Sequence, residues 1–455
     1  AYEIRLSLVG SEMCIRDRNQ TNTFIVSIAI TLALALPAAA QVCGGDCDQN
    51  CAVTVDEILT MVNGALGQVP VASCNSGDTN IDGQLTVDEI LAGVSNALQG
   101  CNGPPCRILE SRCAVPDGTG VNMDAADEAC DYLSSHRFFT GRAALQQPNQ
   151  GVVPYDINTE LFTDYANKHR FVWLPPGTAA PYDPRRPFEF PLGTVLIKTF
   201  AYPRDQTDPS RGEDMLETRL LVHTAEGWVG RPYVWNADNT DAQLKQIGAT
   251  LDVAGIQADG EFGMFKHIVP NANQCKGCHR AFDDLTSPIG PNARNLNKDY
   301  PYADGAANQL TRWAALGILA GAPADPRDAP QAAVFDEPES GSVAERARSY
   351  LDVNCAHCHN PTGPARTSGL FLEFDETNPT RLGLCKQPVA AGRGTGGRSH
   401  VVDPGSPDSS ILTFRVESDD PEIMMPELGR TRAHAEGLVL IEQWIADMDG
   451  ECVLE

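Results

Sequence analysis

Two short segments of the chain place cysteine and histidine at the spacing C-x-x-C-H. The first motif is Cys275–His279 (CKGCH) and the second motif is Cys355–His359 (CAHCH). Two thiols a short turn apart can form thioether bonds to the two vinyl groups of one haem, and the next histidine then lies beneath the iron. A single zinc site built from both motifs gives no reason for a histidine directly after each second cysteine. The sequence therefore predicts two covalently attached haem c groups, bound at Cys275, Cys278, Cys355 and Cys358 and ligated by His279 and His359.

The second haem has a candidate sixth ligand far downstream of its motif. In the segment IMMPELG (Ile423–Gly429) a methionine directly precedes a proline, which resembles the distal-ligand loop of small cytochromes c. We predict Met425 as the sixth ligand, with Met424 as the alternative. A methionine thioether raises the potential of the iron relative to a second imidazole.

The sixth ligand of the first haem stays open in the sequence. No methionine occurs between His279 and Met424. His357 is a poor candidate because it lies between the cysteines of the second motif. The remaining candidates are Met264, His267, His169 and His223. An empty sixth position would admit a small molecule to the iron, as a dihaem peroxidase or oxidase requires, whereas a filled one favours an electron carrier over an enzyme.

A second kind of site is predicted near the N-terminus. The segment DTNIDGQLTVDE (Asp78–Glu89) has the spacing D-x-[DN]-x-[DN]-G-x5-E of an EF-hand calcium loop. In this pattern carboxylate, amide and backbone oxygens surround the ion, and Gly83 permits the sharp turn. The predicted calcium ligands are Asp78, Asn80, Asp82, Gln84 through its backbone carbonyl, and Glu89.

The same pattern occurs 32 residues earlier, in DCDQNCAVTVDE (Asp46–Glu57). Its predicted ligands are Asp46, Asp48, Asn50 and Glu57, so the chain is expected to bind up to two Ca²⁺ ions. Cys51 stands where the loop expects glycine. A loop followed by one helix, twice, resembles a dockerin over about 60 residues. That resemblance implies docking to a cohesin-like scaffold, and a calcium-stabilised module without a partner is the alternative.

The elements that position these residues are predicted from periodicity and turn signals. Thr194–Tyr202 is a β-type run, and Leu216–His223 and Trp228–Trp235 read as a hairpin. A capping box at Ser342–Glu345 starts a helix that leads into Cys355, and Asn308–Leu319 is a second expected helix. The predicted fold class is multi-domain α+β, with a small α calcium-loop repeat, a β-rich sandwich-like middle domain and C-terminal α-helical cytochrome c-like haem domains.

The expected domain boundaries follow shifts in composition. Residues 1–18 read as a non-native extension, and residues 19–40 as a secretory signal peptide because a short apolar run lies between arginines and small residues. Because of this signal peptide we expect an exported protein in the periplasm or at the cell surface. No later segment is long and apolar enough to span a membrane. The further predicted parts are the calcium repeat at 42–106, the β-rich domain at 110–262, the first haem region at 263–320, a linker at 321–341 and the second cytochrome c domain at 342–455.

From Tyr155 to the C-terminus the chain is similar to a family of exported dihaem c-type cytochromes of unassigned role. The resemblance lies in PYDINTELFTDYANKHRFV (Pro154–Val172), FPLGTVLIKTFAY, ETRLLV, YVWN, VPNANQCKGCH, IGPNARNLN and YLDVNCAHCHNPTG. It implies haem binding and electron transfer, and it names no redox partner.

Composition limits the partners of the chain. A net charge of −26 argues against a basic face for nucleic acid and favours a basic redox partner through electrostatic steering. The 15 cysteines fit an oxidising compartment, and isolation along the chain favours Cys113–Cys130 and Cys385–Cys452 as disulfide pairs. The leading hypothesis is therefore a dihaem electron-transfer protein. The alternatives are a dihaem peroxidase or oxidase, and a calcium-dependent protein docked at a surface.

Overall fold

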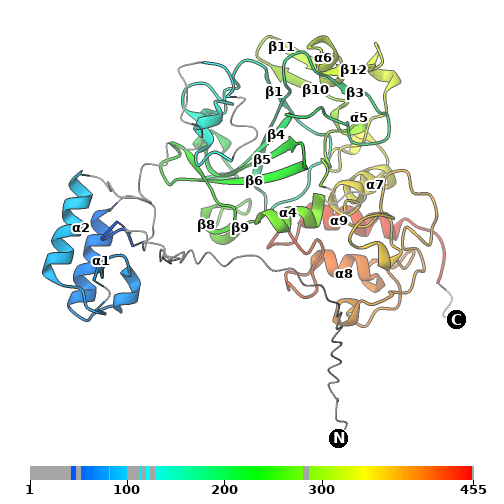
Figure 1. Ribbon diagram of the computed structural model, residues 1–455. Coiled ribbons are helices and arrows are strands. Elements are labelled where there is room, and N and C mark those ends of the chain that lie inside the picture. The colour runs from blue at the N-terminus through cyan, green and yellow to red at the C-terminus, as the bar shows by residue number, and fades with distance from the viewer. Residues whose placement is uncertain are drawn as a thin grey trace, which may run out of the picture. The chain divides into compact units, whose positions relative to one another are not determined.

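A computed structural model describes residues 43–47, 53–80, 82–99, 113, 119–122, 129–279 and 286–452. The chain divides into two compact units, a small unit of residues 1–108 and a large unit of residues 109–455 (Figure 1). The predicted extension at 1–18 and the predicted signal peptide at 19–40 lie outside the described residues. No helix of the described residues is long and apolar enough to cross a membrane.

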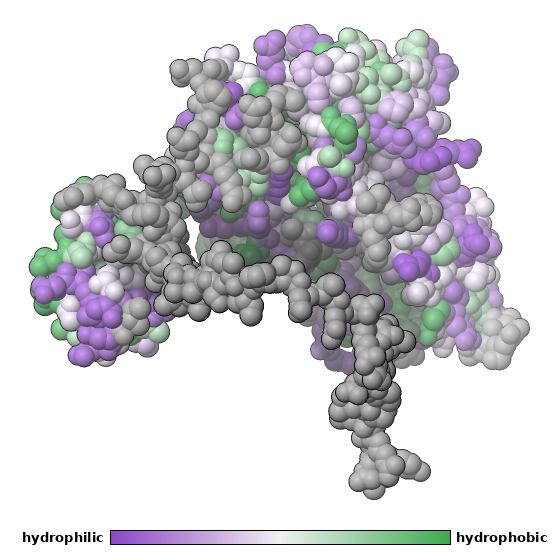
Figure 2. Space-filling view, viewed as in Figure 1, coloured by the Kyte–Doolittle hydropathy of each residue, from purple (hydrophilic) through white to green (hydrophobic). Residues whose placement is uncertain are grey.

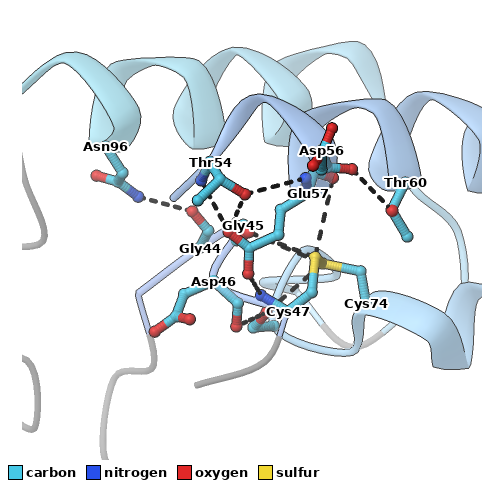
Figure 3. The surroundings of a disulfide bond; sticks show 11 residues. Gly44, Gly45, Asp46, Cys47, Thr54, Asp56, Glu57, Thr60, Cys74 and Asn96 are labelled. Carbon is cyan, nitrogen blue, oxygen red and sulfur yellow. Dashed lines mark hydrogen bonds between the residues drawn. A yellow bond between two sulfur atoms is a disulfide. The ribbon is translucent and has the colours of Figure 1, made fainter. Parts of the chain in front are cut away.

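The small unit contains two helices, α1 (Val55–Ala65) and α2 (Val87–Gln99). The side chain of Thr54 accepts a hydrogen bond from the backbone of Glu57, and the Glu57 carboxylate accepts one from the backbone of Thr54, which forms a capping box at the start of α1. The core of this unit is small and centres on the buried Met61. A disulfide between Cys47 and Cys74 supports it (Figure 3).

The large unit is built on one six-stranded antiparallel sheet with the order β1-β2-β4-β5-β6-β7. The hairpin predicted at Leu216–Trp235 is confirmed as β5 and β6. The sheet strands are β1 (Val152–Tyr155), β2 (Asn167–Trp173), β4 (Val195–Pro203), β5 (Glu213–Thr224), β6 (Gly227–Trp235) and β7 (Ala242–Leu244). Short ribbons are formed by β3 (Ala180–Pro181), β8 (Ala249–Ile256), β9 (Phe262–Val269), β10 (Asp299–Tyr302), β11 (Gly305–Asn308) and β12 (Leu319–Ala320).

Successive side chains of each strand point to opposite faces of the sheet. Ile197 and Leu220 belong to the core on one face, which residues of the segment 133–143 cover. Leu196 and Val172 belong to the core on the other face, covered by residues 293–329 with the short helices α5 (Ala293–Leu296) and α6 (Gln309–Ala315). The helix predicted over Asn308–Leu319 is thus confirmed in shorter form, with Asn308 as its N-cap.

The prediction of a sandwich-like middle domain is wrong. A sandwich needs two large sheets packed face to face, whereas this unit has one large sheet whose faces are covered by loops, short helices and two-stranded ribbons. Short apolar strands separated by turns look the same in a sequence whether a second sheet or a set of loops covers them. The strand pattern therefore predicts the strands but not the second layer.

The prediction of C-terminal α-helical cytochrome c-like haem domains is also wrong. The described residues after 342 contain few helices, namely α7 (Val343–Asn354), α8 (Ile411–Glu417) and α9 (Ala435–Ala446). Turns and 3-10 segments occupy 355–410, where glycine and proline are frequent and disfavour a helix. The capping box at Ser342 and Glu345 is confirmed at the start of α7.

Two further disulfides occur in the large unit. Cys113 pairs with Cys130, and Cys385 pairs with Cys452, as predicted from their isolation along the chain. The second bridge joins the long loop after the second motif to the segment that follows α9. Among the described cysteines only Cys275, Cys278, Cys355 and Cys358 are free.

Candidate functional site

The second calcium-type loop folds as its spacing predicts. The carboxylate of Asp78 accepts hydrogen bonds from the backbone of Asp82 at 3.0 Å and of Gly83 at 2.7 Å. The Asn80 side chain accepts one from Asp82 at 2.9 Å, and Gly83 adopts φ +80°, which favours glycine. The loop therefore curls around its own side-chain oxygens, the arrangement that an oxygen-ligated cation requires.

Glu89 closes this loop from the start of α2. Its Oε1 accepts from the backbone of Thr79 at 2.9 Å, and its Oε2 accepts from the backbone of Thr86 at 2.9 Å. Burial opposes ionisation, but these hydrogen bonds outweigh it and hold the pKa of Glu89 below its ordinary value. Gln84 donates its backbone N–H to Asp82 at 2.9 Å. The five predicted ligands of this loop thus lie between Asp78 and the first turn of α2.

The first calcium-type loop is described only in part. Asp46 and Glu57 are buried, and Glu57 accepts a hydrogen bond from the backbone of Cys47 at 2.8 Å, next to the Cys47–Cys74 disulfide (Figure 3). The predicted ligands Asp48 and Asn50 lie outside the described residues. Glu57 thus occupies the same place relative to α1 as Glu89 does relative to α2.

Apolar side chains lie exposed at equivalent positions of the two helices of the small unit. Each position on α1 has its counterpart 32 residues later on α2, and the exposed fractions lie between 53 % and 82 %. The pairs are Val55 and Val87, Leu59 and Leu91, and Leu66 and Leu98. The space-filling view shows apolar residues among polar ones on this unit (Figure 2). The recurrence of these exposed side chains on two helices makes them a candidate binding surface.

The second motif begins where α7 ends. Cys355 caps this helix, and the backbone N–H groups of Cys358 and His359 both donate to the Cys355 carbonyl, at 3.1 and 2.9 Å. Gly363 folds back onto the motif so closely that a Cβ there would lie 2.3 Å from the Cys358 carbonyl oxygen. Burial lowers the pKa of His359 to about 4, so the imidazole is neutral at pH 7 and able to ligate a metal.

A cavity of about 400 Å³ opens beside the second motif. Cys355, Cys358 and His359 line it, and Met425 lines it from a segment about 70 residues further along the chain. Met424 is buried but is not among the lining residues, which favours Met425 as the ligand. The apolar part of the wall includes Leu370, Leu372, Val401, Ile411, Leu412 and Val416. A haem needs such a cavity, with thiols, an imidazole and a thioether on an apolar wall.

The loop that carries Met425 is held by a buried arginine that the sequence analysis did not identify. The side chain of Arg430 is 3 % exposed. It donates to the carbonyl oxygens of Met425 at 2.9 Å and Ser418 at 3.0 Å, and lies 3.2 Å from those of Arg415 and Val416. Arg430 thereby connects the Met425 loop to the last turn of α8, whose carbonyls lack partners within the helix.

The first motif forms the helix α4 (Ala272–His279), which lies against β6 of the large sheet. A Cβ at Gly230 of β6 would lie 3.2 Å from the Cys275 sulfur, so a side chain there would require Cys275 to shift by a few tenths of an ångström. His279 Nδ1 lies 2.9 Å from the carbonyl oxygen of Ser287. Such a contact fixes the ring and leaves Nε2 free for a metal. Burial lowers the pKa of His279 to about 4, with a smaller contribution from Lys198.

Charged residues cover the part of the sheet face next to α4. Arg170, Lys198 and Arg219 lie directly opposite one another on β2, β4 and β5. Burial and the two arginines hold the pKa of Lys198 well below its ordinary value. A lysine in the middle of the apolar run TVLIKTFAY is the one sequence signal that could have indicated this cluster.

A buried ion pair stands beside these cations. The carboxylate of Glu217, fully buried, lies 2.8 Å from His267 Nε2 and pairs with Arg219. Burial opposes ionisation of Glu217, but Arg219 and the hydrogen bond with His267 outweigh burial and lower its pKa to about 2. His267 is therefore engaged by Glu217.

The other candidate sixth ligands of the first haem also have different surroundings. Met264 is 68 % exposed on β9. His169 pairs with Glu213 at 2.5 Å, and His223 lies 2.8 Å from the Phe190 carbonyl oxygen and stacks on Trp228. The structure therefore assigns none of these four residues to the first motif.

The two motifs meet in the folded chain. The sulfurs of Cys278 and Cys358 and a ring nitrogen of His357 all lie within 4.8 Å of one another. The Cys358 sulfur lies 3.6 Å from the Gly277 carbonyl oxygen, and Gly277 and Cys278 line the same cavity as the second motif. The contact between the two thiols lowers the pKa of Cys278 and raises that of Cys358. Nothing in the local spacing of either motif predicts this meeting.

Comparison of the chain with protein-family models, with curated proteins and with solved structures finds no match. The chemistry of the site therefore rests on the residues themselves.

Proposed function

We propose that the chain is an exported dihaem c-type cytochrome that passes single electrons between partner proteins. The observation that carries this proposal is the cavity of about 400 Å³ in which Cys355, Cys358, His359 and Met425 converge. Two thiols for thioether bonds, a neutral imidazole and a thioether are the groups that attach and ligate a haem of this class.

The residues of this cavity have distinct roles in the proposal. A bound haem supplies an iron that takes up and releases one electron at a time. Cys355 and Cys358 would anchor it, and His359 and Met425 would ligate its iron. The apolar wall would exclude water and, together with the thioether of Met425, would favour the reduced iron. Arg430 keeps the Met425 loop in place.

The first motif is proposed to hold the second haem of the pair. Cys275 and Cys278 provide the attachment sulfurs on α4, and His279, oriented by Ser287, ligates the iron. The net charge of −26 favours a basic redox partner, with an association rate that falls as salt concentration rises.

The haem content of purified protein tests this proposal. The chain is expressed with a haem-attachment system, and its intact mass is measured. We expect two haems in the wild type and one in the Cys355→Ser/Cys358→Ser variant. The Cys113→Ser/Cys130→Ser variant, which loses a disulfide instead, is the matched control and keeps both. An unchanged haem count in the first variant would contradict the assignment.

Binding of carbon monoxide distinguishes the proposed electron carrier from the alternative of an enzyme. Reduced protein is titrated with carbon monoxide while the visible spectrum is recorded. An unchanged spectrum means that both irons keep two firm ligands, which supports the carrier. Binding at one haem in the wild type that is lost in the Cys275→Ser/Cys278→Ser variant means an open site at the first motif, which favours a peroxidase or oxidase.

We also propose that the small unit binds calcium and docks to a protein partner through the exposed apolar side chains of α1 and α2. Their recurrence at equivalent positions is the observation that favours this second function. The test is binding to a purified cohesin-like scaffold domain, with and without a calcium chelator. The Leu59→Asp/Leu91→Asp variant should lose binding and keep its calcium affinity. Binding that survives both the chelator and this variant would refute the proposal.

A further inference from the structure

The second cysteine of each motif lies close to the second cysteine of the other, in the wall of the same cavity. The Cys278 and Cys358 sulfurs lie within 4.8 Å of each other although the residues are 80 positions apart in the chain. The Cys358 sulfur also lies 3.6 Å from the carbonyl oxygen of Gly277, and a Cβ at Gly277 would lie 3.4 Å from Leu428 of the Met425 loop. The first motif therefore forms part of the wall of the cavity beside the second.

Buried polar contacts fix the position of one motif relative to the other. Arg294 of α5 pairs with Asp352 of α7 at 2.7 Å, and both side chains are largely buried. The side chain of Asn354, directly before Cys355, accepts a hydrogen bond from the backbone of Phe162 at 2.8 Å. These contacts fix α7 to α5, which packs on one face of the sheet, and α4 lies against β6 of the same sheet, so both motifs are attached to one packed unit.

From these contacts we infer that the two haems form one electronically coupled pair, adjacent to each other through the thioether sulfurs of Cys278 and Cys358. This inference rests on the proposed function, because it requires a haem at each motif. A thioether joins each sulfur directly to a side arm of the porphyrin. Sulfurs within 4.8 Å of each other therefore bring the edges of the two ring systems close together. The unit of function is then the pair, not two separate carriers.

Electron paramagnetic resonance of the oxidised protein tests the coupling. Each oxidised haem carries unpaired spin, and two such spins held close together broaden or abolish each other's signals. We expect the dihaem protein to show less than half of the intensity obtained by adding the spectra of the Cys275→Ala/Cys278→Ala and Cys355→Ala/Cys358→Ala variants. A wild-type spectrum equal to that sum, in protein with two haems by mass, would overturn the pair and leave the proposed function intact.

The wild type alone provides the second measurement, should either variant fail to fold. On gradual reduction, a coupled pair gains signal intensity as the first electron enters, because the remaining oxidised haem loses its magnetic neighbour. Independent haems lose intensity steadily from the start, which would overturn the pair. Metal analysis of the same samples covers the other chemistry of this cluster. Stoichiometric zinc on Cys278, Cys358 and His357, with no haem by mass, would refute the pair and the proposed function together.

Discussion

Replacement of Arg430 by methionine should make Met425 dissociate from the second haem more easily than in the wild type, because the loop that carries Met425 is held less firmly. Arg430 is buried, and its two shortest hydrogen bonds go to the carbonyl oxygens of Met425 and Ser418. A buried hydrogen bond from a charged donor contributes about 1.5–3 kcal/mol, so the two together contribute about 3–6 kcal/mol. Methionine fills the space and regains about 1.5–3 kcal/mol by burial of its apolar side chain. The expected loss is therefore about 2 kcal/mol.

The loss of free energy can be measured through the competition between Met425 and added imidazole for the iron of the second haem. Imidazole must open the Met425 loop before it reaches the iron of the second haem, so a weaker loop raises its apparent affinity. A loss of about 2 kcal/mol corresponds to an increase of about thirtyfold. The assay is an imidazole titration of the oxidised protein, followed in the visible spectrum and compared with the wild type.

Arg393 provides the matched control for this prediction. It lies in the same region and pairs with Glu422 and Asp420, but its side chain is 71 % exposed. Exposed ion pairs contribute at most about 1 kcal/mol, so Arg393→Met should change the imidazole affinity by less than about fivefold. If Arg430→Met changed the affinity no more than this control, our account of the Met425 loop would be refuted.

Three further predictions concern other parts of the molecule. Gly230→Val should place a side chain against the Cys275 sulfur and reduce haem attachment at the first motif by mass, whereas Gly290→Ala, which enters open space, should keep both haems. The pKa of Glu217 is lowered to about 2 in the folded chain, against about 4.3 in the unfolded chain. The ionised carboxylate therefore stabilises the fold by about 3 kcal/mol at a pH above 4.3, and this contribution is lost as the pH falls toward 2. Unfolding titrations should show this pH dependence in the wild type and not in Glu217→Gln. Calcium at about a hundred times its dissociation constant should stabilise the small unit by about 2.7 kcal/mol, and equal melting curves with and without a chelator would contradict this.

The features that could be predicted from the sequence are those encoded in a few neighbouring residues. An EF-hand loop and a capping box each lie within a short run of neighbouring residues, so their spacing indicates the local geometry. The structure describes the Asp78–Glu89 loop and the Ser342–Glu345 capping box as expected. The Met-Pro step at Met425 was also recognisable, and the structure brings Met425 to the cavity of the second motif.

The features that could not be predicted depend on contacts between distant residues. The meeting of Cys278 with Cys358 depends on how α4 packs on β6, which no local pattern encodes. Gly230 and Arg430 resemble an ordinary strand glycine and an ordinary surface arginine until their neighbours are known. The prediction of helical haem domains was wrong because an expected helix and a haem motif were taken to indicate a helical domain, whereas the glycines and prolines of 355–410 form turns.

The nearness of Cys278 and Cys358 also sets an order of events during maturation. An environment that oxidises Cys385 and Cys452 to a disulfide also exposes to the same oxidant two free thiols whose sulfurs lie within 4.8 Å of each other. A disulfide between Cys278 and Cys358 would block one attachment sulfur in each motif. If the motifs carry haem as proposed, haem has to be attached before such a bond forms, or the two thiols have to be kept reduced until attachment. On the proposed function, the fold thereby links the order of folding and haem attachment to the redox state of these two cysteines.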